Sequence, residues 1–245
     1  MISYRYTCGF GSAAAALVLS GVFATAGAQD SVPRLANGRP DLSGNWSGRA
    51  PRGSMNKPSY KAEFQGRVRE LGGRREFEDP TYDCGHPGFP RAGPPQKIIH
   101  TPGEVVLLYG TTAGMAWRVV PTDGRELPEY NDPTLYGEAV GHWQGDTLVI
   151  EGQNYDVSTW LGARGDDGSN PPGPGDAYFH SQEMRTTERL RYEGENLIYD
   201  VTVTDPVYLA EPWAMDTITL RRRAEAPLEP PICIAISPDD YGFGE

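Results

Sequence analysis

The chain is 245 residues long and carries 22 Lys and Arg against 33 Asp and Glu, which gives a formal net charge of −11. This balance argues against a nucleic-acid partner, because affinity for nucleic acid comes largely from cationic side chains that neutralise phosphates. It argues equally against binding to an anionic membrane surface. The length is enough for one β-rich domain after a short leader.

Residues 1–28 are predicted to be a signal peptide. Arg5 precedes an apolar run over residues 13–19, and Ala26-x-Ala28 fits a cleavage site before Gln29. The run is too short to span a bilayer, and polar sequence follows it, so no membrane span is expected. A buried N-terminal helix is the alternative. We expect an exported protein, either periplasmic or secreted.

Residues 29–80 are predicted to form an extended N-terminal arm with one short helix over about 59–71. Apolar residues recur there at helical spacing, at Tyr60, Phe64, Val68 and Leu71, and Gly72-Gly73 follows as a stop signal. The rest of the arm is rich in Gly, Pro and Arg.

Residues 81–245 are predicted to form a β-barrel-like domain. Short apolar strands and two similar hairpins, "HWQGDTLVIE" and "RYEGENLIYD", follow one another without β-α-β alternation. A meander of this length avoids open edges by curling up. The predicted fold class is therefore all-β, a lipocalin-like up-and-down antiparallel barrel or bent meander. A two-sheet sandwich is the alternative.

Cys84 and Cys233 are the only cysteines after the leader. In an oxidising compartment they are expected to form a disulfide, with two free thiols as the alternative. Free Cys84 beside His86 would suit a Cys–His nucleophile, which a disulfide would rule out. The cysteines and histidines lack the spacing of a zinc site, so no metal is expected.

Five segments together resemble a widespread family of exported bacterial proteins of unassigned function. They are "GRPDLSGNW", "DP…C…PGFPR", "TPGEVVLLYG", "GHWQGDTLVIE" and "HSQEMRTTERLRY". The resemblance covers most of the chain after the leader and implies export and a barrel-like domain, but no catalytic residue or substrate. Members often carry a His directly after the last cysteine, whereas Ile234 follows Cys233 here.

The hairpin over residues 178–206 raises the question of which of its faces is buried. Alternation along its two strands places Leu197, Tyr199, Val201 and Val203 on one face. The same face is predicted to carry four polar side chains: Glu188 midway, and Gln182, His180 and Asp205 at the end away from the turn. A barrel built this way would have a filled floor and a polar mouth.

The polar mouth is the predicted site. His180 with Asp205 or Glu188 would make an acid–base pair, because a carboxylate neighbour or an apolar setting moves such groups toward neutral pH. Tyr155 is a candidate proton donor and Asn154 and Gln182 candidate substrate-binding groups, with Trp143 and Trp213 as a possible aromatic wall. In the structural alternative, Glu188 pairs with an arginine, His180 caps a strand, Asn154 forms a turn, and the aromatic residues pack in the core.

The expected function is an exported enzyme that acts on a small, partly apolar organic molecule by acid–base chemistry, as an isomerase, lyase or hydrolase. The sequence contains no glycine-rich phosphate loop, nucleophile elbow or His-x-x-x-His pair, so no cofactor is expected. The alternatives are a non-catalytic binder of such a molecule and a structural envelope protein with a filled interior.

Overall fold

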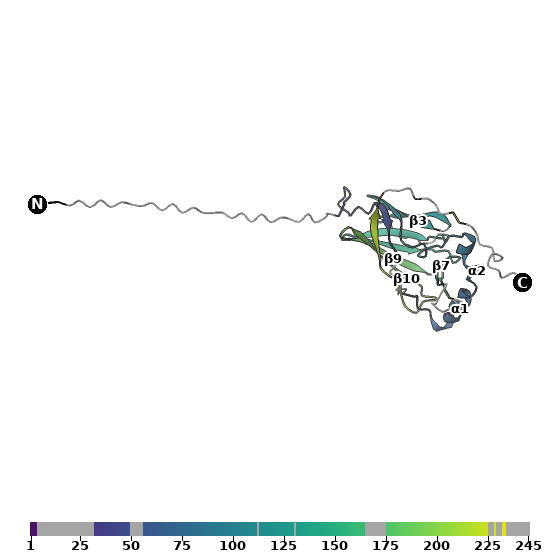
Figure 1. Ribbon diagram of the computed structural model, residues 1–245. Helices are drawn as coiled ribbons and strands as arrows, with labels where there is room; N and C mark the ends of the chain where they lie inside the picture. The colour runs from purple at the N-terminus through teal and green to yellow at the C-terminus, as the bar shows by residue number, and fades with distance from the viewer. Residues whose placement is uncertain are drawn as a thin grey trace. The chain divides into compact units, whose positions relative to one another are not determined.

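A computed structural model describes residues 1–3, 32–49, 56–111, 113–129, 131–164, 175–224, 228 and 232–233 (Figure 1). The chain divides into two units, Met1–Ser31 and Val32–Glu245. The predicted signal peptide falls almost wholly outside the described residues, so it stays a prediction. The second unit contains every helix and strand described below.

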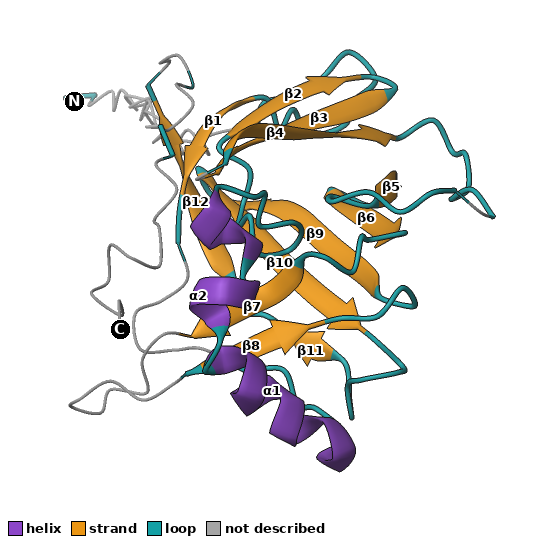
Figure 2. Ribbon diagram, turned by 90° about the vertical axis from the view of Figure 1, so that its right-hand side faces the viewer, coloured by secondary structure: helices purple, strands orange, loops and turns teal. Residues whose placement is uncertain are grey.

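The second unit is built around one large antiparallel sheet. Its strands run in the order β4-β3-β2-β1-β12-β10-β9-β6-β5, and the short β11 pairs with β10. The bounds of these strands are β1 (Gly44–Ser47), β2 (Lys97–Thr101), β3 (Glu104–Thr111), β4 (Gly114–Pro121), β5 (Glu138–Gln144), β6 (Thr147–Gln153), β9 (Arg185–Glu193), β10 (Asn196–Thr204), β11 (Trp213–Ala214) and β12 (Ile218–Arg223). Figure 2 shows β1–β4 above and β9 and β10 crossing behind the helices.

The sheet curls into a nearly closed barrel, and β4 and β5 meet at the place where it stays open. A side chain added at Gly141 of β5 would come within 3.1 Å of Val120 Cγ1 and 3.0 Å of Thr122 Cγ2, so the two strands lie close together. Within the described residues no hydrogen-bonded ladder joins them. We call this opening the seam. The predicted all-β, up-and-down barrel is confirmed, and the segment predicted as an arm supplies β1 to it.

The two similar hairpins have the same turn. Gly145 connects β5 to β6 and Gly194 connects β9 to β10, with φ values of +60° and +61°. Glycine adopts this left-handed conformation at little cost, and a tight two-residue hairpin favours it. In the second hairpin Tyr192 lies opposite Leu197 and Glu188 opposite Val201, so Glu188 shares a face with Leu197 and Val201, as alternation predicted.

Helices and a second, two-stranded sheet flank the barrel. The predicted helix begins as a 3-10 turn, η1 (Ala62–Phe64), and continues as α1 (Gln65–Gly72). Two further short helices follow, α2 (Arg75–Glu78) and the 3-10 helix η2 (Pro80–Asp83), and the small sheet pairs β7 (Trp160–Arg164) with β8 (Asp176–Phe179). Helix α1 packs on β8, where Arg67 lies over the ring of Phe179.

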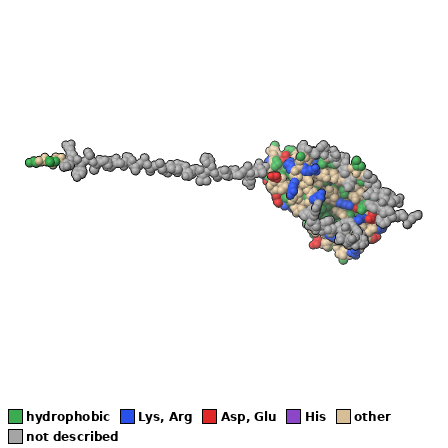
Figure 3. Space-filling view, in the orientation of Figure 1, with side chains coloured by type: hydrophobic (Ala, Val, Ile, Leu, Met, Phe, Trp, Pro, Cys, Tyr) green, Lys and Arg blue, Asp and Glu red, His purple; other side chains and the backbone are tan. Residues whose placement is uncertain are grey.

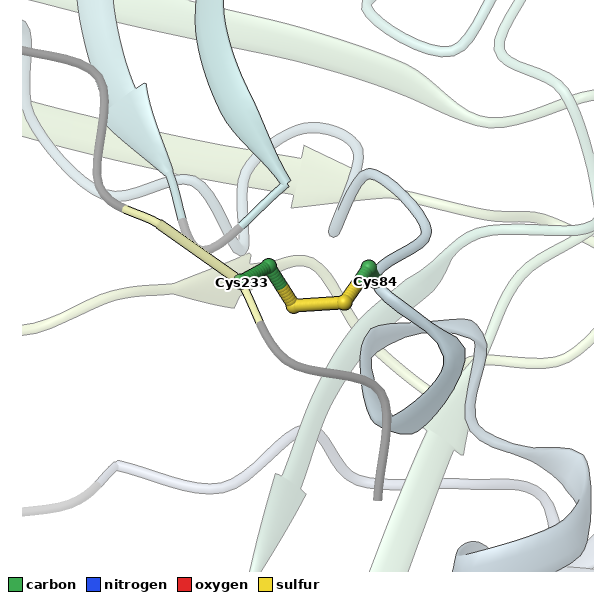
Figure 4. The surroundings of a disulfide bond; sticks show 2 residues. All are labelled: Cys84 and Cys233. Atoms are coloured by element: carbon green, nitrogen blue, oxygen red, sulfur yellow. A yellow bond between two sulfur atoms is a disulfide. The ribbon is translucent and has the colours of Figure 1, made fainter. Parts of the chain in front are cut away.

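A disulfide joins Cys84 to Cys233, as Figure 4 shows, and links the Pro/Gly loop after η2 to the C-terminal segment. The predicted pairing is confirmed. Cys84 therefore has no free thiol, which excludes the Cys–His nucleophile considered from the sequence.

The outward face of the β9–β10 hairpin is mainly polar. Arg185 and Arg189 are exposed, and Arg191 forms an ion pair with Asp200. Figure 3, drawn from the same side as Figure 1, shows Lys and Arg side chains spread over the visible face of this unit.

Candidate functional site

The centre of the barrel holds a buried ion pair. Arg118 lies on β4 between Ala116 and Val120, the other buried residues of that strand, and Glu188 lies on the inward face of β9. Arg118 Nη1 is 2.7 Å from Glu188 Oε1, and the two side chains are 3% and 0% exposed. Tyr199 donates a hydrogen bond of 2.6 Å to Glu188 Oε2. Glu188 thus pairs with an arginine, as the structural alternative held.

Aromatic side chains enclose this pair. Arg118 Nη1 also donates to Tyr109 Oη at 3.3 Å, and its guanidinium carbon lies 4.3 Å from the centre of the Phe89 ring. Burial raises the pKa values of Tyr109 and Tyr199, so both stay neutral. For Arg118, burial is the largest single effect and opposes the charge, but the combined attraction of Glu188 and the surrounding tyrosines raises the pKa. Arg118 therefore carries its charge at neutral pH.

One edge of the Arg118 guanidinium has no hydrogen-bond acceptor in the part of the chain that the structure describes. Nε and Nη2 are both buried, and neither has a partner among the described residues. These two nitrogens form the side edge of the planar fork, which presents two parallel N–H donors to a single partner. Buried donors are normally satisfied, so an unpaired edge calls for an explanation.

Arg118 is also part of the wall of a groove along the seam. The groove has a volume of about 780 Å³ and lies between β4, β5 and the loop that joins them. Its wall is mainly apolar and is formed by Trp117, Arg118, Val119, Pro121, Arg125, Glu126, Pro128, Pro133, Thr134, Leu135, Tyr136, Gly137, Glu138, Ala139, Val140 and Asp156. We call it the seam groove. It brings an apolar surface next to a buried cation.

Tyr136 forms part of the aromatic wall of the seam groove. Its hydroxyl is 3.2 Å from His86 Nδ1, and its ring stacks on Tyr109 at 6.0 Å between centroids. Burial raises the pKa of Tyr136 to about 12, so the hydroxyl stays protonated at neutral pH. The seam groove is thus connected through Tyr109 to the Arg118–Glu188 pair.

A polar mouth was predicted at one end of the barrel, but buried side chains lie at both ends, and the predicted residue Asp205 lines a separate groove. At one end Phe89 is fully buried and stacks on Tyr155. At the other end, the hydroxyl of Tyr192 donates to the Asp41 carbonyl at 2.7 Å, and Arg34 binds Asp146 in the β5–β6 turn. The sequence could not show that loops from outside the hairpins would fill these ends.

The expected pairing of His180 with a carboxylate is wrong. His180 is buried, but its Nδ1 lies 2.9 Å from the Ser181 carbonyl and its Nε2 lies 3.1 Å from Thr159 Oγ1. Burial lowers its pKa, the reverse of the shift expected from a carboxylate partner. Its catalytic role stays a prediction, without the orienting acid on which it was based.

Asp205 and Gln182 also differ from the prediction, because a turn over residues 181–184 separates β8 from β9. This turn ends the alternation that had placed Gln182 on the inner face, and Gln182 is exposed. Asp205 organises the turn, since its carboxylate accepts from the backbone N–H of Ser181 at 2.6 Å and from the hydroxyl of Ser181 at 2.9 Å. It also accepts from the backbone N–H groups of Val207 and Tyr208.

The remaining candidates have structural partners. Asn154 lies in a left-handed turn and donates to Glu138 at 2.7 Å, while Tyr155 is buried and bonds Thr186 at 2.6 Å. Burial raises the pKa of Tyr155 to about 12. Trp143 stacks on His100, and Trp213 is buried and donates to the Asn56 carbonyl. None of the predicted site residues is among those that line the seam groove.

Sequence reasoning missed Arg118 and Tyr136. Arg118 could have been found from the sequence. In "MAWRVVPTDG" every second residue faces inward, and Arg118 alternates with Ala116 and Val120 on that face. A charged residue on that face needs a buried partner. Tyr136 had no such signal, because it lies in the loop before β5.

No protein-family model matches the chain, and neither a curated protein nor a solved structure matches it. The family resemblance drawn from the five motifs therefore stays a prediction. Among the described residues, no helix is long and apolar enough to cross a membrane, and no three His, Cys, Asp or Glu residues are grouped to hold a metal ion.

Proposed function

We propose that this protein is an exported binder of a small, mainly apolar molecule, which it holds in the seam groove without a cofactor. The observation that carries the proposal is the seam groove itself, a mainly apolar concave surface of about 780 Å³ with Trp117, Val119 and Leu135 on its wall. Small-molecule sites combine an apolar concave surface with a few placed polar groups, and the seam groove has both.

The walls of the groove support an apolar ligand. Trp117 and Val119 of β4 are 66% and 47% exposed, although large apolar side chains on the outer face of a barrel normally give way to polar ones. Val140 of β5 and Leu135 of the connecting loop lie on the wall with them. A ligand lying between the two strands would cover these surfaces.

Export is supported by two observations. The chain contains a disulfide, a bond that persists in oxidising compartments and is rare in the cytosol. Residues 1–28 have the composition of a signal peptide, with an apolar run followed by Ala26-x-Ala28. The family resemblance in the five motifs points in the same direction.

The test measures binding of the neutral probe 2-acetylnaphthalene to the protein without its predicted signal peptide, from Gln29 onward. Chemical-shift changes of the backbone amides in NMR spectra report where the probe binds. We expect the largest shifts at Trp117, Val119, Leu135 and Val140. Val119→Glu should abolish them by placing a charge on the wall. Shifts that lie elsewhere, or no shifts at all, would overturn the proposal.

Ile99→Glu is the matched control. Ile99 and Val119 lie in one row across β2, β3 and β4, paired through Val106, and are 45% and 47% exposed. The two substitutions therefore place the same charge on the same outer face, but Ile99 lies outside the groove. Equal loss of binding in both variants would show that the probe adheres to the outer face of the sheet.

A further inference from the structure

We propose that the ligand of the seam groove is a short, extended peptide with apolar side chains and a positive charge, which adds a strand along the free edge of β4. The inference rests on the proposed function and names the chemical class of its ligand. It follows from the directions of the two strands at the seam, from the backbone groups that β4 leaves unpaired, and from the charges around the groove.

The two strands at the seam run parallel to each other. Among the described residues, the path from β4 to β5 contains nine strands, and every neighbouring pair on it is antiparallel. Each step reverses the direction, so the first and the last of nine strands point the same way. A strand added antiparallel to β4 is therefore antiparallel to β5 as well, and it continues the alternation around the barrel.

One edge of β4 carries backbone groups that bond no other strand. The β3–β4 hairpin closes at Thr111 and Gly114 with two residues between them, so these form a hydrogen-bonded pair and the even-numbered residues of β4 bond β3. The N–H and C=O groups of Trp117 and Val119 therefore point toward the seam. In the described part of the chain, no backbone bond outside the ladders satisfies them. Pro121 follows in the same phase, where its missing N–H removes no ladder bond.

The free edge of β4 favours a peptide over other apolar ligands. Its N–H and C=O groups recur at the spacing of an extended strand, and an exposed edge binds peptides by strand addition. Trp117 and Val119 both line the seam groove, which places this edge at the groove. Side chains of neighbouring strands share a face, so alternate side chains of the peptide would lie beside exposed Trp117 and Val119, where apolar ones bury the most surface.

The charges around the groove favour a cationic peptide. Two arginines line it, but Arg118 pairs with Glu188 inside the barrel and Arg125 pairs with Asp123. The wall also contains three acids, and none of them forms an ion pair with a described residue: Glu126, Glu138 and Asp156. A Lys side chain at one end of the peptide would therefore meet excess negative charge.

The experiment titrates acetyl-Val-Ala-Val-Lys amide into the unmodified protein from Gln29 onward, with calorimetry for the affinity and NMR for amide hydrogen exchange. We expect binding, with slower exchange at the amides of Trp117 and Val119. The amides of Ala116 and Arg118 already bond β3, so their exchange should not change. A peptide with Glu in place of Lys should bind more weakly.

A second peptide tests the role of the backbone. The same sequence N-methylated at every residue keeps the side chains and the charge but has no backbone N–H donor within it. It should bind at least tenfold more weakly, as the loss of two or more hydrogen bonds predicts.

Val119→Pro removes a free donor of β4 without removing a bond to β3, because Pro is tolerated where the N–H faces away from the ladder. Val119→Ala is the matched control, since it shortens the same side chain and keeps the N–H. We expect the Pro variant to bind the peptide about fivefold more weakly than the Ala variant, the equivalent of one hydrogen bond.

No binding of the peptide, or equal binding of its N-methylated form, would overturn this inference. NMR shifts from 2-acetylnaphthalene in the groove would then leave the proposed function standing, and their absence would overturn that as well. Tighter binding of the Glu peptide would overturn the assigned charge. A dimer of the protein that Val119→Pro dissociates would assign the edge of β4 to a second copy of the chain instead. The comparison of the two peptides decides the question even if Val119→Pro does not fold.

Discussion

Glu188 and Arg118 pair in the interior of the barrel although 70 residues separate them along the chain. Arg118 lies on β4, which ends the sheet order on one side, and Glu188 lies on β9, near the other end. The contact therefore reaches across the barrel and depends on its curvature. It connects the wall of the seam groove to the strands on the opposite side.

Glu188→Gln should lower the free energy of unfolding by about 3–5 kcal/mol, because it leaves the buried charge of Arg118 without compensation. Arg118→Met/Glu188→Gln should be less destabilised than Glu188→Gln alone, since the double variant buries no charge. Urea denaturation followed by circular dichroism measures both.

The control for this pair is Arg125→Gln, which breaks the exposed ion pair with Asp123. Solvent screens exposed pairs and they contribute little, so this variant should stay close in stability to the unmodified protein. A loss from Glu188→Gln no larger than that from Arg125→Gln would show that the buried pair has no special role in stability.

The stability of the protein should fall as the pH decreases below about 6.5, the pKa of an unperturbed histidine. Burial lowers the pKa of folded His180, so in this range the unfolded chain takes up a proton that the folded chain does not. The decrease is at most about 1.4 kcal/mol per pH unit for each such histidine. Above about pH 7.5 both states are neutral at this position, and the contribution is constant.

Urea denaturation at pH 7.5 and 5.5 measures this effect, and His180→Gln should reduce the difference between the two values. Part of the stability difference between pH 7.5 and pH 5.5 should remain in this variant, because burial also lowers the pKa of His100. A histidine NMR titration gives the pKa of His180 directly. A value above 6.5 would contradict the buried, neutral ring and restore the acid–base pair expected from the sequence.

The local pairing of β9 and β10 was predictable, because alternation and a short turn fix which residues face each other. Leu197, Tyr199, Val201 and Val203 are buried, and Glu188 is buried with them, as predicted. Its partner was not predictable, since the pairing of β4 across the barrel depends on curvature and strand order rather than on local pattern. Alternation alone does not predict a contact between strands that are not neighbours in the sheet.

The predicted pairing of His180 with a carboxylate failed because of a turn. The prediction continued the alternation of β9 backward through residues 181–184. These residues form a turn, and the strand before it, β8, pairs with β7 in the small sheet. Ser181 and Asp205 make the hydrogen bonds of this turn, and both are residue types that favour turns. The sequence thus contained residues that favour a turn at this point, but the prediction followed the long run of alternating residues in β9.

Cys84→Ser/Cys233→Ser should lower the free energy of unfolding by about 2–5 kcal/mol, because the bond restricts the unfolded chain over a long loop. The two cysteines are 149 residues apart. Dithiothreitol should lower the melting temperature of the unmodified protein and leave that of the variant unchanged. Thiol titration of the denatured protein from Gln29 onward should find no free thiol, and two would contradict the bond.

Substitution by alanine should change the free energy of unfolding in opposite directions at Gly152 and Gly66, because the two glycines have different surroundings. Gly152 on β6 lies opposite Thr186, and a Cβ there would overlap the hydroxyls of Tyr155 and Thr186, which bond each other at 2.6 Å. Gly152→Ala should therefore lower the free energy of unfolding by about 1–3 kcal/mol through overpacking.

Gly66 in α1 has nothing within 4 Å of an added Cβ. Gly66→Ala should raise the free energy of unfolding by about 0.5–1 kcal/mol, because alanine loses less conformational freedom in a helix than glycine does. Thermal unfolding of the two variants compares them under the same conditions. A stabilising Gly152→Ala would mean that Tyr155 can move away from β6, and the barrel end that it closes together with Phe89 would then be open to small molecules.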